Sequence, residues 1–504
     1  MTDVVVDTAD GPLCGSRDSD ITLFAGIPFA APPVGELRFA PPQPVARWTE
    51  VRDATDFAAD PPQGATAPEG APPPSGPLAG VLALAGGSSR PWSEDCLYLN
   101  VWTPDVAGRR PVIVWIYGGG FERGSAAPPG TGGEVLARVT GCVVVAMNYR
   151  VGALGFAHLA DLGGAGWEGS TNLGLQDQLA ALRWCQANIA AFGGDPSRVT
   201  VGGLSAGAFC IGAMLGMPSA AGLFSRAILH GGSTQRVFPS AIGTAIAEDL
   251  LAALRLDDID GLRRVPAQQI LDIQMKVIDT DIGRRNLPGG RSWGVVLDGQ
   301  VVPQHPHSAL TSGSARGVAV VVGASRDEMR LFQLAQGDAF PPTDAAAMLA
   351  EIDRAGYSEP PALYDAYRDR LLTAGVSDSL AELRGAFLTD EIYRVPATRL
   401  AEAQLAAGGK AWTMLFSDAP LGPLVGACHG ADMFYLFDLI SVLGITDPER
   451  LAVRDELHDA WRRFASTGDP GWPMHAPGAT RQFGGGADFV TEPIDDRVTE
   501  LRRS

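Results

Sequence analysis

The chain has 504 residues, of which 46% are hydrophobic and 19% are charged, and its formal net charge is −18. This composition is ordinary for a soluble globular protein with a large core, and the acidic balance argues against nucleic acid as a partner. No apolar run approaches the ~18–20 residues of a membrane span, and the N-terminus has neither the basic start nor the apolar stretch of a signal peptide. We therefore expect neither a nucleic acid nor a membrane among its partners.

Cysteine usage predicts a reduced protein. The six cysteines lie far apart and form no CxxC pair or other metal-ligand spacing; they are Cys14, Cys96, Cys142, Cys185, Cys210 and Cys428. Several of them lie in apolar segments, where cysteine is more often a small core residue than a ligand. We expect a cytoplasmic protein without a metal site.

The first part of the chain predicts short strands separated by loops. Two β patterns, at residues 4–7 and 21–24, predict a small N-terminal sheet. Residues 60–91 are rich in Pro, Gly and Ala, which is typical of a long surface loop. Apolar runs rich in β-branched residues then predict strands at residues 97–102, 112–116 and 142–147.

From residue 174 onward, predicted helices and strands alternate. Residues 174–192 have the spacing of an amphipathic helix, closed by two glycines, and residues 344–372 and 380–407 form alanine-rich helical stretches. Further strands are predicted at residues 199–202, 226–230, 318–323 and 411–416. This alternation indicates the α/β class, with a mostly parallel central sheet flanked by helices. We expect one domain, residues 1–504, with cap insertions at roughly 240–290 and 335–405.

The most informative motif is Gly203-Leu204-Ser205-Ala206-Gly207, a G-x-S-x-G pattern directly after the predicted strand at 199–202. A sharp strand-to-helix turn of this kind holds the serine hydroxyl clear of the backbone. Glycines are needed two residues to either side because side chains there would collide. Ser205 is therefore a candidate nucleophile, although the pattern alone also arises by chance in a glycine-rich chain.

A second glycine-rich turn predicts an oxyanion hole. The strand at 112–116 runs into Tyr117-Gly118-Gly119-Gly120-Phe121, where glycines let backbone N–H groups approach a developing oxyanion. A phosphate-binding loop is the rival interpretation, but no Lys-Ser/Thr pair follows and the G-x-G-x-x-G spacing fails at Arg123. The expected donors are the N–H groups of Gly119 and Gly120, joined by that of Ala206.

An acid and a base are expected after two later strands, in the chain order serine, acid, histidine. The strand at 318–323 leads to two adjacent carboxylates, Asp327 and Glu328, and the strand at 411–416 leads through a Gly/Pro-rich loop to His429. His230 ends a core strand and His458 lies in a helical run, so neither has the loop freedom that a base needs. The pattern alone leaves the choice between the two carboxylates open.

Several longer motifs resemble one enzyme family. They include Phe24-Ala25-Gly26-Ile27-Pro28-Phe29-Ala30, Ser93-Glu94-Asp95-Cys96-Leu97-Tyr98-Leu99-Asn100-Val101-Trp102, Asn148-Tyr149-Arg150-Val151-Gly152, Phe192-Gly193-Gly194-Asp195-Pro196 and Thr467-Gly468-Asp469-Pro470. In this order they resemble the type-B carboxylesterases, a branch of the α/β-hydrolases, over nearly the whole chain. The resemblance implies that Ser205 is the nucleophile, His429 the base and Glu328 the acid. It also implies two ion pairs, Arg38 with Glu94 and Arg150 with Asp177.

The implied activity is hydrolysis of carboxylic esters through an acyl-enzyme, without a cofactor, by a monomer or homodimer. An amidase or carbamate hydrolase with the same triad is the alternative. A non-catalytic binding scaffold of the same fold is a further one, because fold does not decide function.

Two departures from the family bear on the substrate. Cholinesterases of this family typically carry a glutamate before the nucleophile, and this chain has Leu204 there. Residues 85–90 contain no tryptophan that could stack a quaternary ammonium group. Both features disfavour cationic substrates, and we expect esters of neutral small molecules.

Overall fold

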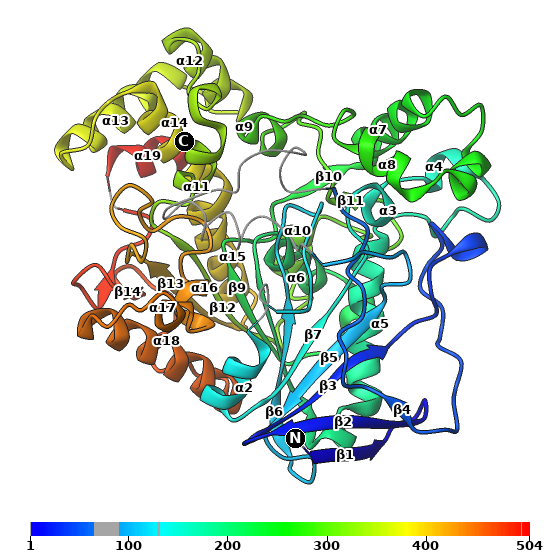
Figure 1. The fold of residues 1–504 in the computed structure, drawn as a ribbon. Helices are drawn as coiled ribbons and strands as arrows, with labels where there is room; N and C mark the ends of the chain where they lie inside the picture. The colour runs from blue at the N-terminus through cyan, green and yellow to red at the C-terminus, as the bar shows by residue number, and fades with distance from the viewer. Residues whose placement is uncertain (1, 65–89, 129–131, 495, 504) are drawn as a thin grey trace.

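The computed structural model describes residues 2–64, 90–128, 132–494 and 496–503. One large sheet runs through the centre of the molecule, with helices packed along it (Figure 1). Across the sheet the strands follow in the order β1 (Thr2–Asp7), β2 (Pro12–Asp18), β3 (Ile21–Pro28), β5 (Tyr98–Thr103), β7 (Val143–Met147), β6 (Arg110–Ile116), β8 (Gly194–Leu204), β9 (Arg226–His230), β12 (Ala319–Ser325), β13 (Lys410–Phe416), β14 (Thr480–Phe483) and β15 (Phe489–Val490).

The middle of this sheet is parallel. Every neighbouring pair from β7 to β14 is parallel, and the interior strands are buried apolar runs, as in the all-buried pattern of β7. Their carboxyl ends therefore lie at the same edge of the sheet, where loops with different functions meet. The predicted mostly parallel α/β fold is confirmed.

The N-terminal strands, predicted as a small N-terminal sheet, lie at one edge of the central sheet. β1, β2 and β3 continue the central sheet, because β3 pairs antiparallel with β5, and β4 (Arg52–Asp53) pairs with β2. The backbone groups of β5 would otherwise remain unpaired along that edge. Sequence analysis predicted β1 and β3 but not β2, which contains glycine and charged residues.

Helices cover both faces of the sheet. A Cβ on Gly202 would meet Trp461 of α18 (Pro448–Thr467), whereas one on Gly203 would meet Ile211 of α6 (Ala206–Leu215). Because consecutive strand residues point to opposite faces, these two helices lie on opposite sides. The helix predicted at 174–192 is α5 (Leu173–Asn188), followed by a 3₁₀ turn that ends at left-handed Gly193.

Two groups of helices lie within the stretches predicted as insertions, and all of their labelled helices except α15 lie in the upper part of Figure 1. The first group is α7 (Ser240–Ala253), α8 (Ala267–Gln274) and α9 (Ile282–Asn286), and the second is α12 (Ala345–Arg354), α13 (Pro360–Thr373), α14 (Leu380–Thr389), a π-helical turn (Asp390–Arg394) and α15 (Val395–Ala406). α15 packs against β12 and β13 and so also covers the sheet. Most of the predicted surface loop, residues 65–89, lies outside the described residues.

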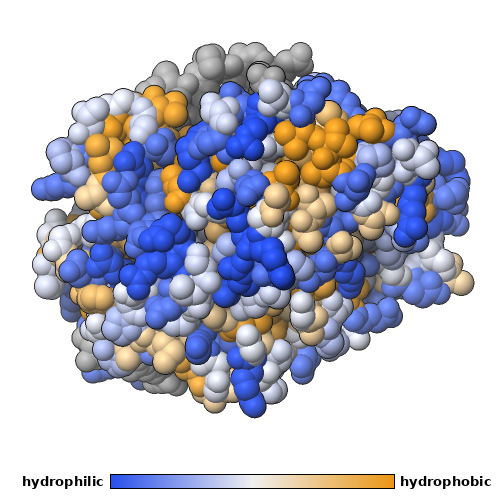
Figure 2. Space-filling view, turned by 90° about the horizontal axis from the view of Figure 1, so that it is seen from below, coloured by the Kyte–Doolittle hydropathy of each residue, from blue (hydrophilic) through white to orange (hydrophobic). Residues whose placement is uncertain are grey.

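Shorter elements complete the chain: α2 (Gly133–Thr140), α3 (Gly152–Phe156), α4 (Ala160–Gly163), α10 (Pro306–Thr311), α11 (Arg330–Gln336), α16 (Met433–Leu436), α17 (Leu439–Val442), α19 (Arg497–Arg503) and a two-stranded sheet of β10 (Val237–Pro239) and β11 (Val295–Leu297). Seen from below, hydrophilic residues cover much of the surface, with a group of hydrophobic ones near one edge (Figure 2).

Within the described ranges, no helix has the length and apolar character needed to cross a membrane.

Candidate active site

Ser205 lies at the turn between β8 and α6, as the G-x-S-x-G motif predicts. Its backbone has φ 55° and ψ −121°, a region that non-glycine residues rarely adopt. The Ser205 N–H donates to the His230 carbonyl at 2.9 Å, and the Ser205 carbonyl accepts from the Phe209 N–H at 2.8 Å. The end of β9 and the first turn of α6 therefore hold the strained turn in place.

The two motif glycines are required by close backbone contacts. A Cβ on Gly203 would lie 2.8 Å from the Ile116 carbonyl oxygen, and a Cβ on Gly207 would lie 2.2 Å from the same oxygen. Contacts this short do not occur in folded proteins, so any larger residue would push β8 and α6 away from β6. The structure thus supports the steric reason given for the motif.

His429 and Glu328 form a buried pair. His429 Nδ1 lies 2.5 Å from Glu328 Oε2, and the other carboxylate oxygen accepts the Ser325 N–H at 2.7 Å. Glu328 is 1% exposed and His429 is 8% exposed. The remaining ring nitrogen, His429 Nε2, is buried and has no hydrogen-bond partner among the described residues. A carboxylate bound to Nδ1 fixes the tautomer that leaves Nε2 able to accept a proton.

The loop of His429 lies against the turn of Ser205. A Cβ on Gly430 would come within 3.4 Å of Leu204 Cδ2, and a Cβ on Gly231 would lie 2.9 Å from His429 Cε1. Gly231 follows His230, whose carbonyl accepts the Ser205 N–H. The loops that carry Ser205, Gly231 and His429 therefore meet at this point. The structure therefore brings together the predicted serine, histidine and glutamate.

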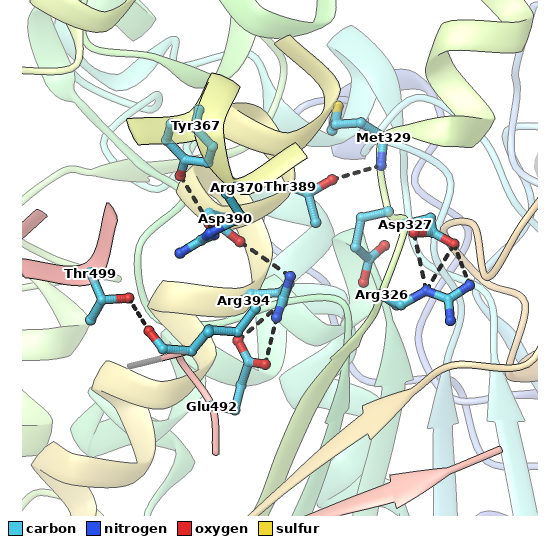
Figure 3. A network of polar contacts seen from close by, with 12 residues as sticks. Arg326, Asp327, Met329, Tyr367, Arg370, Thr389, Asp390, Arg394, Glu492 and Thr499 are labelled. Atoms are coloured by element: carbon cyan, nitrogen blue, oxygen red, sulfur yellow. Dashed lines mark hydrogen bonds and ion pairs between the residues drawn. The ribbon is translucent and has the colours of Figure 1, made fainter. Parts of the chain in front are cut away.

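Asp327 and Glu328 point in different directions, which separates the two carboxylates that the sequence left open. Asp327 Oδ2 accepts the Ala427 N–H at 3.0 Å. It also pairs with Arg326 at 3.0 Å, as the close-up shows (Figure 3). The Asp327 side chain is 29% exposed, and its ion pair is with Arg326 rather than with a histidine. It therefore braces the loop that carries His429, whereas Glu328 contacts the imidazole itself.

Two aromatic rings flank His429. The Tyr393 ring centroid lies 4.9 Å from that of His429, and the Phe332 ring lies 5.5 Å away. Tyr393 belongs to the π-helical turn Asp390–Arg394, a rare geometry that occurs often at functional sites. Sequence analysis missed both residues, because they have no motif and come from segments that only the tertiary structure places beside the imidazole.

An ion-pair network fixes this π-helical turn (Figure 3). Arg394 Nη2 lies 2.6 Å from Glu492 Oε2, and Arg370 Nη1 lies 2.8 Å from Asp390 Oδ2. The Tyr367 hydroxyl donates to the same Asp390 oxygen at 2.9 Å. Neighbouring guanidinium groups hold the pKa of Asp390 below its usual range even though the group is buried. The turn that presents Tyr393 to His429 is thus held from both ends.

The predicted oxyanion loop lies directly beside the nucleophile turn. A Cβ on Gly118 would lie 3.0 Å from Ser205 Cβ, so the loop and the serine are in contact. Gly119 and Gly120 have φ values of 115° and 67°. A Cβ on Gly119 would lie 2.2 Å from the Arg123 carbonyl oxygen, and no described atom lies within 4 Å of one on Gly120. Both glycines are therefore needed for conformation, and Gly120 faces open space.

The third predicted donor is the N–H of Ala206, the first residue of α6. The first N–H groups of a helix have no carbonyl partner within the helix, and the helix dipole places partial positive charge there. Neither Gly119 nor Gly120 donates a backbone hydrogen bond to any residue that the structure describes. That these three N–H groups bind an oxyanion stays a prediction.

A strained serine at a strand-to-helix turn of a parallel sheet, with a buried carboxylate–histidine pair beside it, is the arrangement of an α/β-hydrolase. Residues 2–481 match the carboxylesterase family. The chain belongs to this family, and it is a carboxylic ester hydrolase of the serine type.

Relatives and solved structures agree with this assignment. The chain is 32% identical to the para-nitrobenzyl esterase of Bacillus subtilis (strain 168), over 94% of this chain and 93% of that one. It is 34% identical to the fumonisin B1 esterase of Sphingopyxis macrogoltabida, over 91% and 82%. Among solved structures, a carboxylesterase of Geobacillus stearothermophilus superposes with a TM-score of 0.83 at 32% identity, covering 99% of both chains. A thermophilic PNB esterase gives a TM-score of 0.85 at 29% identity, also covering 99% of both.

Proposed function

We propose that Ser205 is the nucleophile, His429 the general base and Glu328 the residue that orients the imidazole. The observation that carries this assignment is the 2.5 Å contact of Glu328 with His429 Nδ1, which leaves Nε2 without a described partner next to the Ser205 turn. A histidine held by a carboxylate on one nitrogen can take the serine proton with the other.

The reaction proceeds in two halves. In the first, Ser205 Oγ attacks the ester carbonyl, His429 Nε2 accepts the hydroxyl proton, and the same proton passes to the leaving alcohol. In the second, water attacks the acyl-enzyme, giving its proton to His429, which returns it to Ser205 as the carboxylic acid leaves. The ester and one water become an acid and an alcohol, and no cofactor takes part.

The oxyanion of each tetrahedral intermediate would be bound by the N–H groups of Gly119, Gly120 and Ala206. Donors that are already in position stabilise the charge without reorganising during the reaction, and loss of one such donor costs about 10²- to 10³-fold in kcat in other enzymes. Support comes from the contact of this loop with Ser205 and from the positive φ values of Gly119 and Gly120, which favour glycine at both positions.

The test is covalent labelling. A fluorophosphonate probe should add one label per chain, at Ser205, and abolish hydrolysis of an activated aryl ester. In Ser205→Ala, labelling should vanish and kcat should fall by about 10⁶-fold. Label on another serine, or substantial turnover in the alanine variant, would contradict the assignment. Amide and carbamate substrates assayed beside the ester would separate the alternatives.

The domain and cellular setting are part of the same proposal. We place residues 1–504 in one domain, with the helices near 240–290 and 335–405 as insertions around the site, in a monomer or homodimer. The six free cysteines, five of them buried, support a reducing compartment such as the cytoplasm. Light scattering on the purified chain would give the oligomeric state.

A further inference from the structure

Two arginines converge on one hydroxyl near the oxyanion loop. Arg236 Nη2 and Arg285 Nη2 each lie 3.2 Å from Ser292 Oγ. That hydroxyl itself donates to the Trp293 carbonyl at 3.0 Å, so its oxygen serves as acceptor for both guanidinium groups. Two like charges held this close repel each other, and an anion bound between them would relieve the repulsion.

The local charge balance is positive. Arg285 pairs with Glu122, whose side chain is 6% exposed, and Arg123 Nη2 lies 4.0 Å from the same carboxylate. Arg236 has no carboxylate partner among the described residues, and its Nε is buried without a hydrogen bond. Burial lowers the pKa of Arg236 to about 10, so the group still carries its charge at neutral pH. Two guanidinium groups thus share the Glu122 carboxylate and Arg236 has none in the described part of the chain, in a protein whose net charge is −18.

Two arginines that are more deeply buried than Arg236 are balanced. Arg150 is 4% exposed and pairs with Asp177, and Arg384 is 6% exposed and pairs with both Glu351 and Asp281. Buried charge normally comes with such partners, because an unpaired ion in a low dielectric is costly. The uncompensated charge of Arg236 therefore calls for a partner from outside the described chain.

The arginines lie next to the proposed reaction centre. The Arg236 guanidinium carbon lies 5.0 Å from the ring centre of Phe121, which follows the oxyanion glycines, and 5.6 Å from that of Phe209, one helical turn after Ser205. The ring of Phe209 in turn lies 6.2 Å from that of Tyr393, the residue that packs on His429. Arg236 is partly exposed and Arg285 is 12% exposed, so a ligand can reach them.

We propose that Arg236 and Arg285 form a carboxylate-binding subsite beside Ser205, so that the preferred substrates are esters that carry a free carboxylate. This inference rests on the proposed role of Ser205 and replaces the neutral ester that the sequence predicts. The guanidinium fork matches a carboxylate with two parallel hydrogen bonds.

The first test compares esters that differ in one carboxylate. On the acyl side, monoethyl glutarate is compared with ethyl pentanoate; on the alcohol side, the acetate ester of 4-hydroxybutanoate is compared with butyl acetate. The wild-type enzyme should favour the anionic member of one pair by about 10- to 150-fold in kcat/KM, the range of a charge-assisted hydrogen bond. A preference in the first pair places the subsite on the acyl side, and a preference in the second pair places it on the alcohol side.

The second test removes the charge. Arg236→Gln and Arg285→Gln should each lower the ratio of the two kcat/KM values about 10-fold or more, and Arg236→Lys should keep part of it. Arg291→Gln is the matched control, because Arg291 lies in the same segment but pairs with Asp249. In that variant the ratio should stay as in the wild type.

The outcomes separate this inference from the proposed function. If both members of each pair are hydrolysed equally while the fluorophosphonate labels Ser205, the subsite is wrong and the esterase mechanism stands. A preference that survives both Arg→Gln changes would also overturn the subsite. If Ser205 is not labelled and no ester is hydrolysed, the proposed function itself fails.

Discussion

His230 Nδ1 lies 2.5 Å from Asp432 Oδ2, forming a second buried histidine–carboxylate pair behind the one that His429 makes with Glu328. The His230 ring stacks on Trp461 with centroids 5.6 Å apart, and the His230 carbonyl holds the Ser205 N–H. Because Asp432 follows His429 by three residues, this pair joins the nucleophile turn to the loop of the proposed base.

We expect Asp432→Asn to lower the free energy of unfolding by ~1–3 kcal/mol, because a buried hydrogen bond to a charged group is weakened. It should also slow the fluorophosphonate labelling of Ser205, since the loop of His429 loses an anchor. Chemical denaturation and labelling rates measure the two effects. Asp455→Asn in the same region is the control, because Asp455 is 66% exposed and should change stability by less than ~0.5 kcal/mol. Equal behaviour of both variants would show that the pair has no positioning role.

Glu328→Gln should reduce kcat by up to ~10⁴-fold with little effect on folding, because the amide no longer stabilises the correct histidine tautomer and its charged form. Asp327→Asn should keep most of the activity and lose mainly stability, because Asp327 contacts Ala427 and Arg326 rather than the imidazole. Steady-state kinetics and thermal unfolding of the two variants, side by side, check this division. The opposite pattern would transfer the role to Asp327.

Gly231→Ala should impair catalysis more than stability. The new Cβ would lie 2.9 Å from His429 Cε1, so the ring must move, and φ of 55° adds backbone strain. Gly444→Ala is the matched control: it has φ of 71° and no described atom within 4 Å of its Cβ position. Both should lose about 1 kcal/mol of stability, but kcat should fall only in Gly231→Ala. An active Gly231→Ala enzyme would mean that the position of His429 is not critical.

Removing one partner of an ion pair should lower the free energy of unfolding more when the pair is buried than when it is exposed. The Arg150 and Asp177 side chains are 4% and 0% exposed, and Asp177→Ala should cost ~3–5 kcal/mol because Arg150 is left unpaired in the interior. The Arg138–Glu134 pair is about half exposed, so Glu134→Ala should cost less than ~1 kcal/mol. Urea denaturation of both variants gives the comparison. Similar losses in the two would contradict the burial argument.

Local sequence determined much of the fold and the positions of the proposed triad. Glycines at 203 and 207 specify a turn that no larger side chain fits, and apolar β-branched runs specify buried strands; both depend on contacts between near neighbours and on steric limits of the backbone. Family resemblance also predicted the pairs Arg38–Glu94 and Arg150–Asp177, and both are present in the structure.

Tertiary structure alone decided the features that join distant segments. Asp327 and Glu328 are neighbours in sequence, and only the path of the strand end turns one toward Ala427 and the other toward His429. The pairing of His230 with Asp432, and the convergence of Arg236 and Arg285 on Ser292, link loops that no local pattern connects. Parallel strands place their carboxyl-end loops together regardless of separation along the chain, so the contacts that define charge and specificity depend on the order of strands in the sheet.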